Sequence, residues 1–290
     1  MPDFIACFEA ARTEETPQGL QLLFFAPPML EADAIAAMLN ELPGVAGASC
    51  DLVRVADVPD AAKLVSDSGP PASVLGLISW ANHTIKLVQF DEPMPYGPVE
   101  SCVGPAMLPP PMKVDASQHQ AHVLLYYAGA YPDTLERFAA LCAVAGALAR
   151  FDAITVLNEE ARAAAPVSDL VPDSGEDAME TYRTLPIPYL LGGFVKMDAG
   201  NAERPWVRTF ANHRLGLPNL ARQLAGHDQT ASTFQLFAGM LGYLRTMGET
   251  FTAGDAIDLG DGAKFSLREP TEAEWFLDSV GPMLVITSIE

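Results

Sequence analysis

Apolar positions along the first 165 residues form short runs that predict β-strands. Each run is rich in aliphatic or aromatic residues, or alternates apolar and polar positions, and ends near proline, glycine or polar residues. One run is divided by a polar interruption at residues 81–84, which predicts a hairpin with a tight turn. A proline-rich connection covers residues 105–111. The predicted runs are residues 19–28, 50–59, 74–90, 121–129 and 152–158.

Two stretches between these runs have the period of amphipathic helices. Residues 29–44 place apolar side chains at helical spacing and stop at Pro43-Gly44. Residues 131–151 carry an apolar stripe behind a capping residue, Asp133 or Thr134, with Glu136 in the first turn. The order of strands and helices predicts an α+β fold with helices packed on one face of mixed or antiparallel sheets; ferredoxin-like units are one arrangement that it allows.

The rest of the chain predicts a second unit behind a linker. Residues 166–183 are acidic, contain proline and glycine, and lack sustained periodicity, as linkers do. Residues 184–290 then restart with short strands, a helix over 230–249, a hairpin signal at Asp261-Gly262 and a final apolar strand. The sequence therefore predicts an N-terminal α+β unit over 1–165, a linker over 166–183 and a C-terminal α+β unit over 184–290.

Composition places the chain among ordinary globular proteins. It has 290 residues, of which 49% are apolar and 19% charged. No apolar run approaches the roughly 20 residues that cross a bilayer, and the first residues lack the positive charge of a secretory signal. We therefore expect a cytoplasmic protein. Four widely spaced cysteines, without CxxC pairing, predict reduced thiols in the core rather than a zinc site or a disulfide framework.

The net charge narrows the range of partners. With 37 acidic and 17 basic residues the formal charge is −20, which repels phosphate backbones and anionic lipids. Nucleic acid and membrane surfaces are therefore not expected as partners. A basic protein partner is favoured, although such a charge can also serve solubility alone. The sequence does not define the oligomeric state.

Motifs for catalysis, metals and cofactors are weak. His119 and His122 stand three apart at a predicted strand, so their side chains point to opposite faces and do not form a chelating pair. There is no GxSxG elbow, and the glycine pairs lack the context of a phosphate loop. Paired carboxylates such as those in "EAEW" (272–275) suit the start of a solvated helix. We therefore expect no catalytic residue, metal or cofactor.

One segment carries a net positive charge in an otherwise acidic chain. Four of the 17 basic residues fall within 19 positions, 204–222, beside the motif "FANHR". Arginine forks match carboxylates, so this segment is a candidate site for an anion, a carboxylate or an acidic partner. Internal pairing with the surplus of acidic residues is the alternative. The candidate binding residues are Arg208, Asn212, His213 and Arg214.

The same segment carries a family resemblance. "VRTFANHRLGLPNLARQL", the helix that follows it, "ETFTAGDAIDLGDGAKFSL" and the terminal "MLVITSI" resemble the bacterial domain-of-unknown-function family 4261, over roughly the last 100 residues. The resemblance implies an α+β fold in a bacterial protein and no reaction. This chain has Asn219 after Pro218, where the family pattern has an acidic residue.

Two functions of different class follow. The first is a non-catalytic interaction protein with an acidic surface, of the immunity or accessory type found in toxin and secretion systems. The second is a small-ligand binder or enzyme that uses the arginine and histidine cluster at an interdomain cleft. A second "ANH" tripeptide, in "WANHT" (80–84), does not share the flanks of the first; it predicts only a turn, in which Asn82 and His83 adopt unusual backbone angles.

Overall fold

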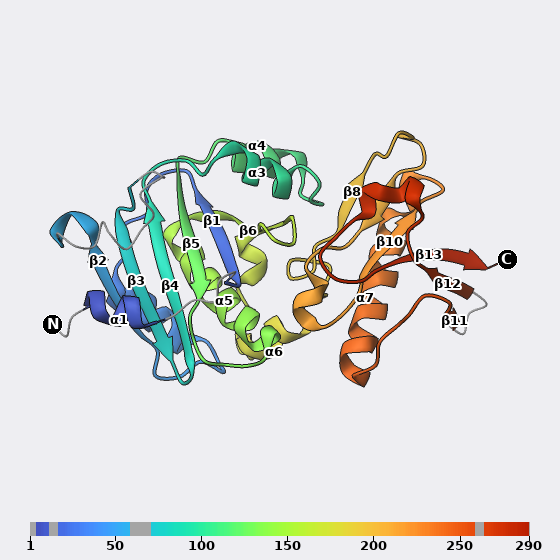
Figure 1. Ribbon diagram of the computed structural model, residues 1–290. Helices are drawn as coiled ribbons and strands as arrows, with labels where there is room; N and C mark the ends of the chain where they lie inside the picture. Colours follow the sequence, from blue (N-terminus) through green and yellow to red (C-terminus); the bar gives the residue numbers. More distant parts are fainter. Residues whose placement is uncertain (1–3, 12–16, 59–70, 259–263, 290) are drawn as a thin grey trace. The chain divides into compact units, whose positions relative to one another are not determined.

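A computed structural model describes residues 4–11, 17–58, 71–258 and 264–289 of the chain. These residues form two units, each with its own β-sheet (Figure 1). Unit 1 consists of residues 1–159 and 164–185, and unit 2 consists of residues 160–163 and 186–290. Helices accompany both sheets, so the α+β class predicted from the sequence is confirmed.

A seven-stranded sheet forms the centre of unit 1, in the order β2-β3-β4-β5-β1-β6-β7. β1 lies between β5 and β6 and is antiparallel to both. Each predicted run supplies one strand, except that residues 74–90 supply both β3 and β4, the predicted hairpin. The strands are β1 Gly19–Phe24, β2 Ser49–Arg54, β3 Val74–Trp80, β4 His83–Phe90, β5 Ala121–Tyr127, β6 Ala153–Asn158 and β7 Ala163–Pro166.

Helices lie on both faces of this sheet rather than on the single face that we expected. Leu23 of β1 packs in a core cluster with side chains of α3 and α4. Because successive residues of a strand point to opposite faces, Leu22 faces the other way, where α5 lies against β1 and β5 (Figure 1). The helices are α1 Phe4–Ala10, α2 Ala32–Glu41, α3 Tyr96–Val103, α4 Pro110–Ser117, α5 Thr134–Leu148 and α6 Ala178–Thr184.

The segment predicted as a linker, residues 166–183, is instead a folded part of unit 1. It contains the 3-10 turn η4 Val167–Leu170 and most of α6. The side chain of Asp177 caps α6 by accepting a hydrogen bond from the backbone N–H of Glu180 at 3.0 Å. Tyr182 is buried and donates its hydroxyl to the carbonyl oxygen of Leu170 at 2.8 Å. The acidic composition of this segment thus led us to predict a linker where a short amphipathic helix lies.

The turn between β3 and β4 differs in detail from the prediction. Trp80 pairs with His83, so Ala81 and Asn82 alone make the turn, and Ala81 takes the positive φ of 47°. His83 is the first residue of β4 and is buried. Its ring stacks on Tyr131 with centres 5.1 Å apart, so it is a packed strand residue rather than a turn residue.

Unit 2 contains a six-stranded mixed sheet in the order β11-β12-β13-β10-β9-β8. β10 and β13 run parallel, while the other neighbours are antiparallel. The hairpin signal at Asp261-Gly262 lies outside the described residues, and the strands before and after it, β11 and β12, pair antiparallel. The strands are β8 Val195–Met197, β9 Trp206–Arg208, β10 Asn219–Gln223, β11 Ala256–Asp258, β12 Lys264–Arg268 and β13 Met283–Ile289.

Two elements cover this sheet. The long helix α7, Thr230–Met247, contributes Phe237 and Leu241 to a core that also contains Leu220 of β10. A separate cluster joins Met283 of β13 to Leu277, the last residue of the 3-10 segment η7 Glu272–Leu277. The η7 segment and the loop that follows it lead into β13, and this part of unit 2 forms the site described next.

Candidate functional site

The predicted binding residues lie on a tightly turned segment between β9 and β10. Arg208 ends β9, and Asn212 begins the 3-10 turn η5 Asn212–Leu215. Left-handed residues stand on either side of that turn, Ala211 with φ 59° and Gly216 with φ 70°. Such angles are uncommon for a residue with a side chain, so Ala211 marks a backbone that the surrounding packing holds in place.

Arg208 is a buried charge that forms no salt bridge with a carboxylate of the described residues. It is 1% exposed, and its Nη1 donates to the carbonyl oxygens of Phe276 at 3.0 Å and Asp278 at 3.2 Å. Its Nε and Nη2 make no hydrogen bond within the part of the chain that the structure describes. The guanidinium carbon lies 4.1 Å from the ring centre of Phe210, and that of Arg162 lies 4.7 Å from the same ring.

The surroundings of Arg208 disfavour its charged form. Burial, and then the like charge of Arg162, lower the pKa of Arg208 to about 10. The side chain therefore stays charged at neutral pH, and its Nη1 donates to backbone carbonyls. This arrangement fixes the position of the 276–278 backbone; it does not leave a guanidinium open to solvent.

Asn212 belongs to a buried network of uncharged polar groups. Its side-chain amide donates to Thr209 Oγ1 at 2.8 Å and to the carbonyl oxygen of Pro218 at 3.1 Å. Its backbone N–H donates to Asn219 Oδ1 at 3.3 Å. All of these side chains are buried. Asn219, the residue after Pro218, therefore has a structural contact here.

His213 and Arg214 share one carboxylate. Arg214 Nε donates to Glu160 Oε1 at 2.8 Å, and His213 Nε2 lies 3.4 Å from the same oxygen. These side chains are partly exposed, and Glu160 belongs to the short piece of unit 2 that precedes residue 164. Internal pairing with an acidic residue, the alternative to a binding role, is therefore what the structure shows for His213 and Arg214.

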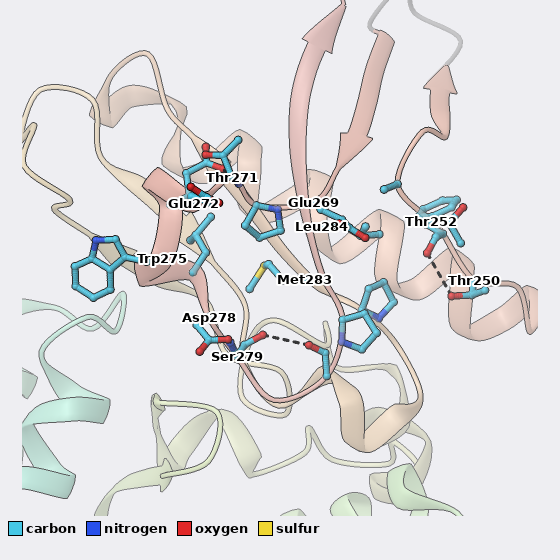
Figure 2. Close-up of a pocket in the computed structure, with 18 of the residues that line it drawn as sticks. Thr250, Thr252, Glu269, Thr271, Glu272, Trp275, Asp278, Ser279, Met283 and Leu284 are labelled. Atoms are coloured by element: carbon cyan, nitrogen blue, oxygen red, sulfur yellow. Dashed lines mark hydrogen bonds between the residues drawn. The ribbon is translucent and has the colours of Figure 1, made fainter.

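A cavity of about 710 Å³ opens in the same unit (Figure 2). Its floor includes Met283 and Leu284 of β13, and its sides come from residues 250–253, from η7 and from the loop after it. None of the four predicted binding residues lines it, and no lysine, arginine or histidine occurs among its lining residues. Its acidic lining residues are Glu269, Glu272, Glu274 and Asp278.

Glu274 is fully engaged by its neighbours. Both carboxylate oxygens accept from Arg268, at 2.7 Å and 2.6 Å, and Oε2 also accepts from the backbone N–H of Thr271 at 2.8 Å. The hydrogen bonds from Arg268, and then that from Thr271, lower the pKa of Glu274 to about 2. Thr271 and Glu274 form a capping box, so the "EAEW" carboxylates do begin a helical segment.

The remaining carboxylates of the cavity are differently placed. Glu269 and Glu272 are exposed and form no ion pair with a residue in the described ranges. Asp278 is exposed as well, and its carboxylate accepts only the backbone N–H of Ser279, at 3.0 Å, among these residues. Glu269 and Glu272 therefore have no ion-pair partner among the described residues, whereas the charge of Asp278 acts on Arg208 and raises the pKa of that guanidinium.

The predicted segment supports the wall of this cavity from behind. The wall loop, residues 276–282, is held by Arg208 at its start and by Asn219, whose amide donates to the carbonyl oxygen of Val280 at 3.1 Å. Gly281 has φ 79°, and a β-carbon there would lie 2.6 Å from the β-carbon of His213. Sequence reasoning located this segment by its charge but missed the cavity, whose lining comes from three separated stretches.

Two of the four cysteines, Cys102 and Cys142, are buried as predicted, but Cys7 is exposed, so the prediction of a core thiol is wrong there. The buried histidines are held by contacts within unit 1. His119 accepts from the backbone N–H of Met94 at 2.8 Å, and His122 stacks on Phe90. Burial, with Asp51 next, raises the pKa of Cys50 to about 12, and burial also raises that of Cys142, opposite to what a thiolate nucleophile requires. Within the described ranges no three His, Cys, Asp or Glu side chains are grouped for a metal ion, and no helix is long and apolar enough to cross a membrane.

Comparison with known proteins gives no relative. No family model matches the chain, and neither a curated protein nor a solved structure matches it. The family resemblance noted in the sequence therefore stays a prediction.

Proposed function

We propose that this protein is a non-catalytic interaction module whose unit 1 binds a basic protein partner. The observation that carries the proposal is the division of charge between the units. Unit 1 contains 24 acidic and 8 basic residues, a formal charge of −16, whereas unit 2 contains 13 and 9, a charge of −4. Negative charge spread evenly over both units would serve solubility equally well. Charge concentrated on one unit attracts a basic partner more strongly to that unit.

The acidic segment, residues 169–180, is where we place the contact. Its five carboxylates are exposed, and they lie on η4, on α6 and on the turn between them: Asp169, Asp173, Glu176, Asp177 and Glu180.

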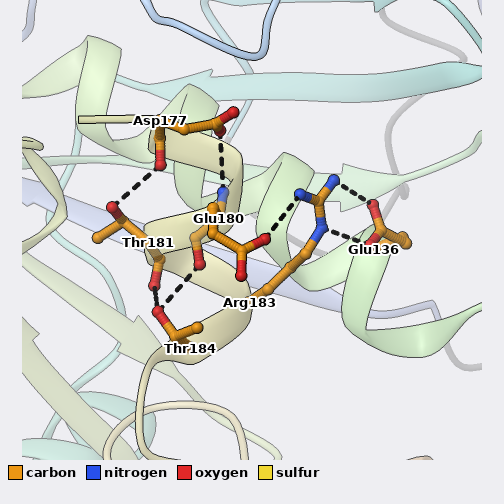
Figure 3. Close-up of polar contacts among 6 residues, drawn as sticks. All are labelled: Glu136, Asp177, Glu180, Thr181, Arg183 and Thr184. Atoms are coloured by element: carbon orange, nitrogen blue, oxygen red, sulfur yellow. Dashed lines mark hydrogen bonds and ion pairs between the residues drawn. The ribbon is translucent and has the colours of Figure 1, made fainter. Parts of the chain in front are cut away.

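The acidic segment has a firm attachment to the rest of unit 1 (Figure 3). Arg183 of α6 binds Glu136 of α5 through two hydrogen bonds, Nε to Oε1 at 2.5 Å and Nη2 to Oε2 at 3.0 Å. Tyr182 fixes the same helix to Leu170. Glu180 lies on this docked helix and Asp177 caps it, so engaging these carboxylates costs less conformational entropy than engaging carboxylates on a loose linker. This supports a preformed binding surface.

The alternative predicted from the sequence needs free cationic side chains at a shared site. Arg208 and Asn212 are instead buried, and Arg214 binds Glu160. We therefore favour the interaction module, and among such proteins the immunity or accessory type of toxin and secretion systems is the kind we propose.

Affinity capture with matched charge variants tests the proposal. Asp173→Asn/Glu176→Gln removes two charges from the acidic segment and spares the cap at Asp177 and the ion pairs of Arg183. Glu203→Gln/Asp228→Asn removes two exposed charges from unit 2 and is the control. A partner captured from native extract is identified and purified, and its Kd is measured at low and at about 0.3 M salt, where charge attraction is screened.

We expect a basic partner that binds the wild type and the control equally, binds the acidic-segment variant at least about fivefold more weakly, and loses affinity with salt. A partner indifferent to both variants and to salt would contradict the proposal. So would a protein that retains no partner but co-purifies with a metabolite that raises its unfolding temperature.

A further inference from the structure

The cavity of unit 2 combines an apolar floor with carboxylates that lack a cation. We propose that it binds a primary ammonium group on an aliphatic stem, and that the lysine side chain of a basic partner supplies that group. The inference deepens the proposed function and rests on it for the source of the ligand, but it concerns unit 2 and residues outside the acidic segment.

Charge is the first argument. Glu269, Glu272 and Asp278 border one concave surface, and no basic residue lines it. Glu274, the fourth acid, already binds Arg268. The exposed carboxylates give this surface a negative charge that a bound cation would reduce. An anionic ligand would increase it, so the chemistry of the lining selects for a cation.

The floor is the second argument, because it distinguishes an organic cation from a metal ion. Met283, with Phe251 at the side, presents carbon and sulfur rather than oxygen ligands. A lysine side chain buries its methylene stem against such a surface and keeps its ammonium group at a polar rim. A hydrated metal ion would gain nothing from the apolar floor.

The size and rim of the cavity are the third argument, and they favour a lysine within a peptide over a free amine. A volume of about 710 Å³ lies within the range of ordinary ligand sites and exceeds what one lysine side chain fills. Trp275 also lines the cavity, and its indole is 77% exposed and extends away from the floor (Figure 2). Exposed tryptophans are common contact residues in interfaces, so residues next to the lysine have a surface to pack on.

Contacts within unit 2 hold the wall of the cavity in place without a ligand. Arg208 and Asn219 hold the wall loop by hydrogen bonds to its backbone, and His213 packs against Gly281. Both anchoring side chains are 1% exposed. A rigid wall reduces the ordering cost of binding and fixes Asp278 in place beside the floor.

Short probes with and without the ammonium group test the inference. The acetylated and amidated tripeptide Ala-Lys-Ala is titrated into the full chain, with Ala-norleucine-Ala as the uncharged match and n-butylamine as the free amine. Backbone amide NMR shifts of residues 269–284 give the Kd. Quenching of tryptophan fluorescence by acrylamide provides a second readout, because Trp80 and Trp206 are buried and Trp275 is not.

We expect the lysine peptide to bind and the norleucine peptide not to bind. Glu269→Gln/Glu272→Gln should weaken lysine-peptide binding by about fivefold or more, the effect of losing an exposed ion pair, whereas Glu203→Gln should leave it unchanged. Tighter binding of the peptide than of n-butylamine assigns the site to a partner's lysine. Equal binding supports the ammonium site with a small amine as its ligand.

Equal binding of the lysine and norleucine peptides, absence of binding, or lysine binding that Glu269→Gln/Glu272→Gln leaves intact would overturn the inference. Unfolding curves of the double variant confirm that it is folded, since Glu274 and its contacts to Arg268 are untouched. The capture experiment on the acidic segment substitutes no residue of the cavity, so failure here and failure of the proposed function give different results.

Discussion

At the scale of single residues, Arg208 shows how a charge can be buried without a salt bridge. Its guanidinium is held by two backbone carbonyls and by the face of Phe210. The geometry depends on the planar guanidinium, which donates to both carbonyls through Nη1 while its carbon lies over the Phe210 ring. A lysine has the same charge but neither the fork nor the stacking plane.

We therefore expect Arg208→Lys to destabilise unit 2 by about 2 kcal/mol, since it leaves buried polar groups without good partners. Amides of the wall loop, residues 276–282, should exchange with solvent faster. Hydrogen exchange followed by mass spectrometry measures the second effect. The control is Arg204→Lys, at an exposed position in the same unit, and equal protection of the wall loop in both variants would contradict the role given to Arg208.

Glu274 provides a pH-dependent test. Its pKa in the folded protein is about 2, against an ordinary value of 4.5. A lowered pKa stabilises the fold at any pH above the ordinary value, and the contribution is lost as the pH falls from about 4.5 toward 2. Glu274→Gln should therefore cost about 1–2 kcal/mol at pH 7, the combined effect of a helix cap and an ion pair.

The difference between Glu274→Gln and the wild type should shrink steadily below pH 4.5. Urea unfolding at a series of pH values measures it, with Glu203→Gln as an exposed control. A difference that stays constant down to pH 2.5 would show that the carboxylate charge contributes nothing.

The sequence could locate these residues only in part. Its charge pattern singled out residues 204–222, because four arginines in so acidic a chain are visible without a structure. The direction of each side chain is not visible in this way. Arg208 points into the interior because it ends a strand covered by the wall loop, and that loop lies about 70 residues away in sequence. Long-range packing of this kind leaves no local signal.

At the scale of elements, strands were predicted better than short helices. The strand runs of unit 1 stand out because buried antiparallel strands are continuous or alternating in apolar residues. α4 was missed because prolines suggested a connection, although Pro110 occupies the first helical position, where its missing N–H costs nothing. α6 was missed because only one face of a seven-residue helix is apolar.

The docking of α6 should be measurable through Tyr182. Tyr182→Phe keeps the packing of the ring but leaves the carbonyl of Leu170 without its donor, and this should cost about 1–2 kcal/mol of unfolding free energy. Tyr96→Phe removes a hydroxyl from a residue that is 75% exposed and should change nothing. Chemical unfolding of unit 1 compares the two, and equal stability of both variants would mean that α6 is held by its other contacts alone.

At the scale of the whole molecule, residues 160–163 are the short piece by which the chain enters unit 2 before returning to unit 1. The carboxylate of Glu160 binds Arg214, and the guanidinium of Arg162 lies over Phe210. Gly193 must be a glycine here, because it has φ 59° and a β-carbon would lie 1.9 Å from the carbonyl oxygen of Ala161. This piece is therefore an integral part of unit 2.

We expect Glu160→Gln to lower the stability of unit 2 by up to about 1 kcal/mol while leaving unit 1 unchanged, because the pair is partly exposed. The neighbouring exposed residue gives the control, Glu159→Gln, which falls in unit 1. Native-state hydrogen exchange resolves the two units separately. Loss of protection in unit 1 rather than unit 2 would show that the division at residue 160 is wrong.

The three crossings between the units, after residues 159, 163 and 185, also bear on how such a gene can change. An end-to-end fusion of two reading frames leaves each encoded domain as one uninterrupted stretch. Here a four-codon piece of unit 2 lies inside the coding stretch of unit 1, so a single recombination point cannot exchange unit 2 for another domain. The two units should therefore be inherited together. A recombined gene that joins a foreign domain at codon 186 would still encode residues 160–163, but without the rest of unit 2 that they pack into.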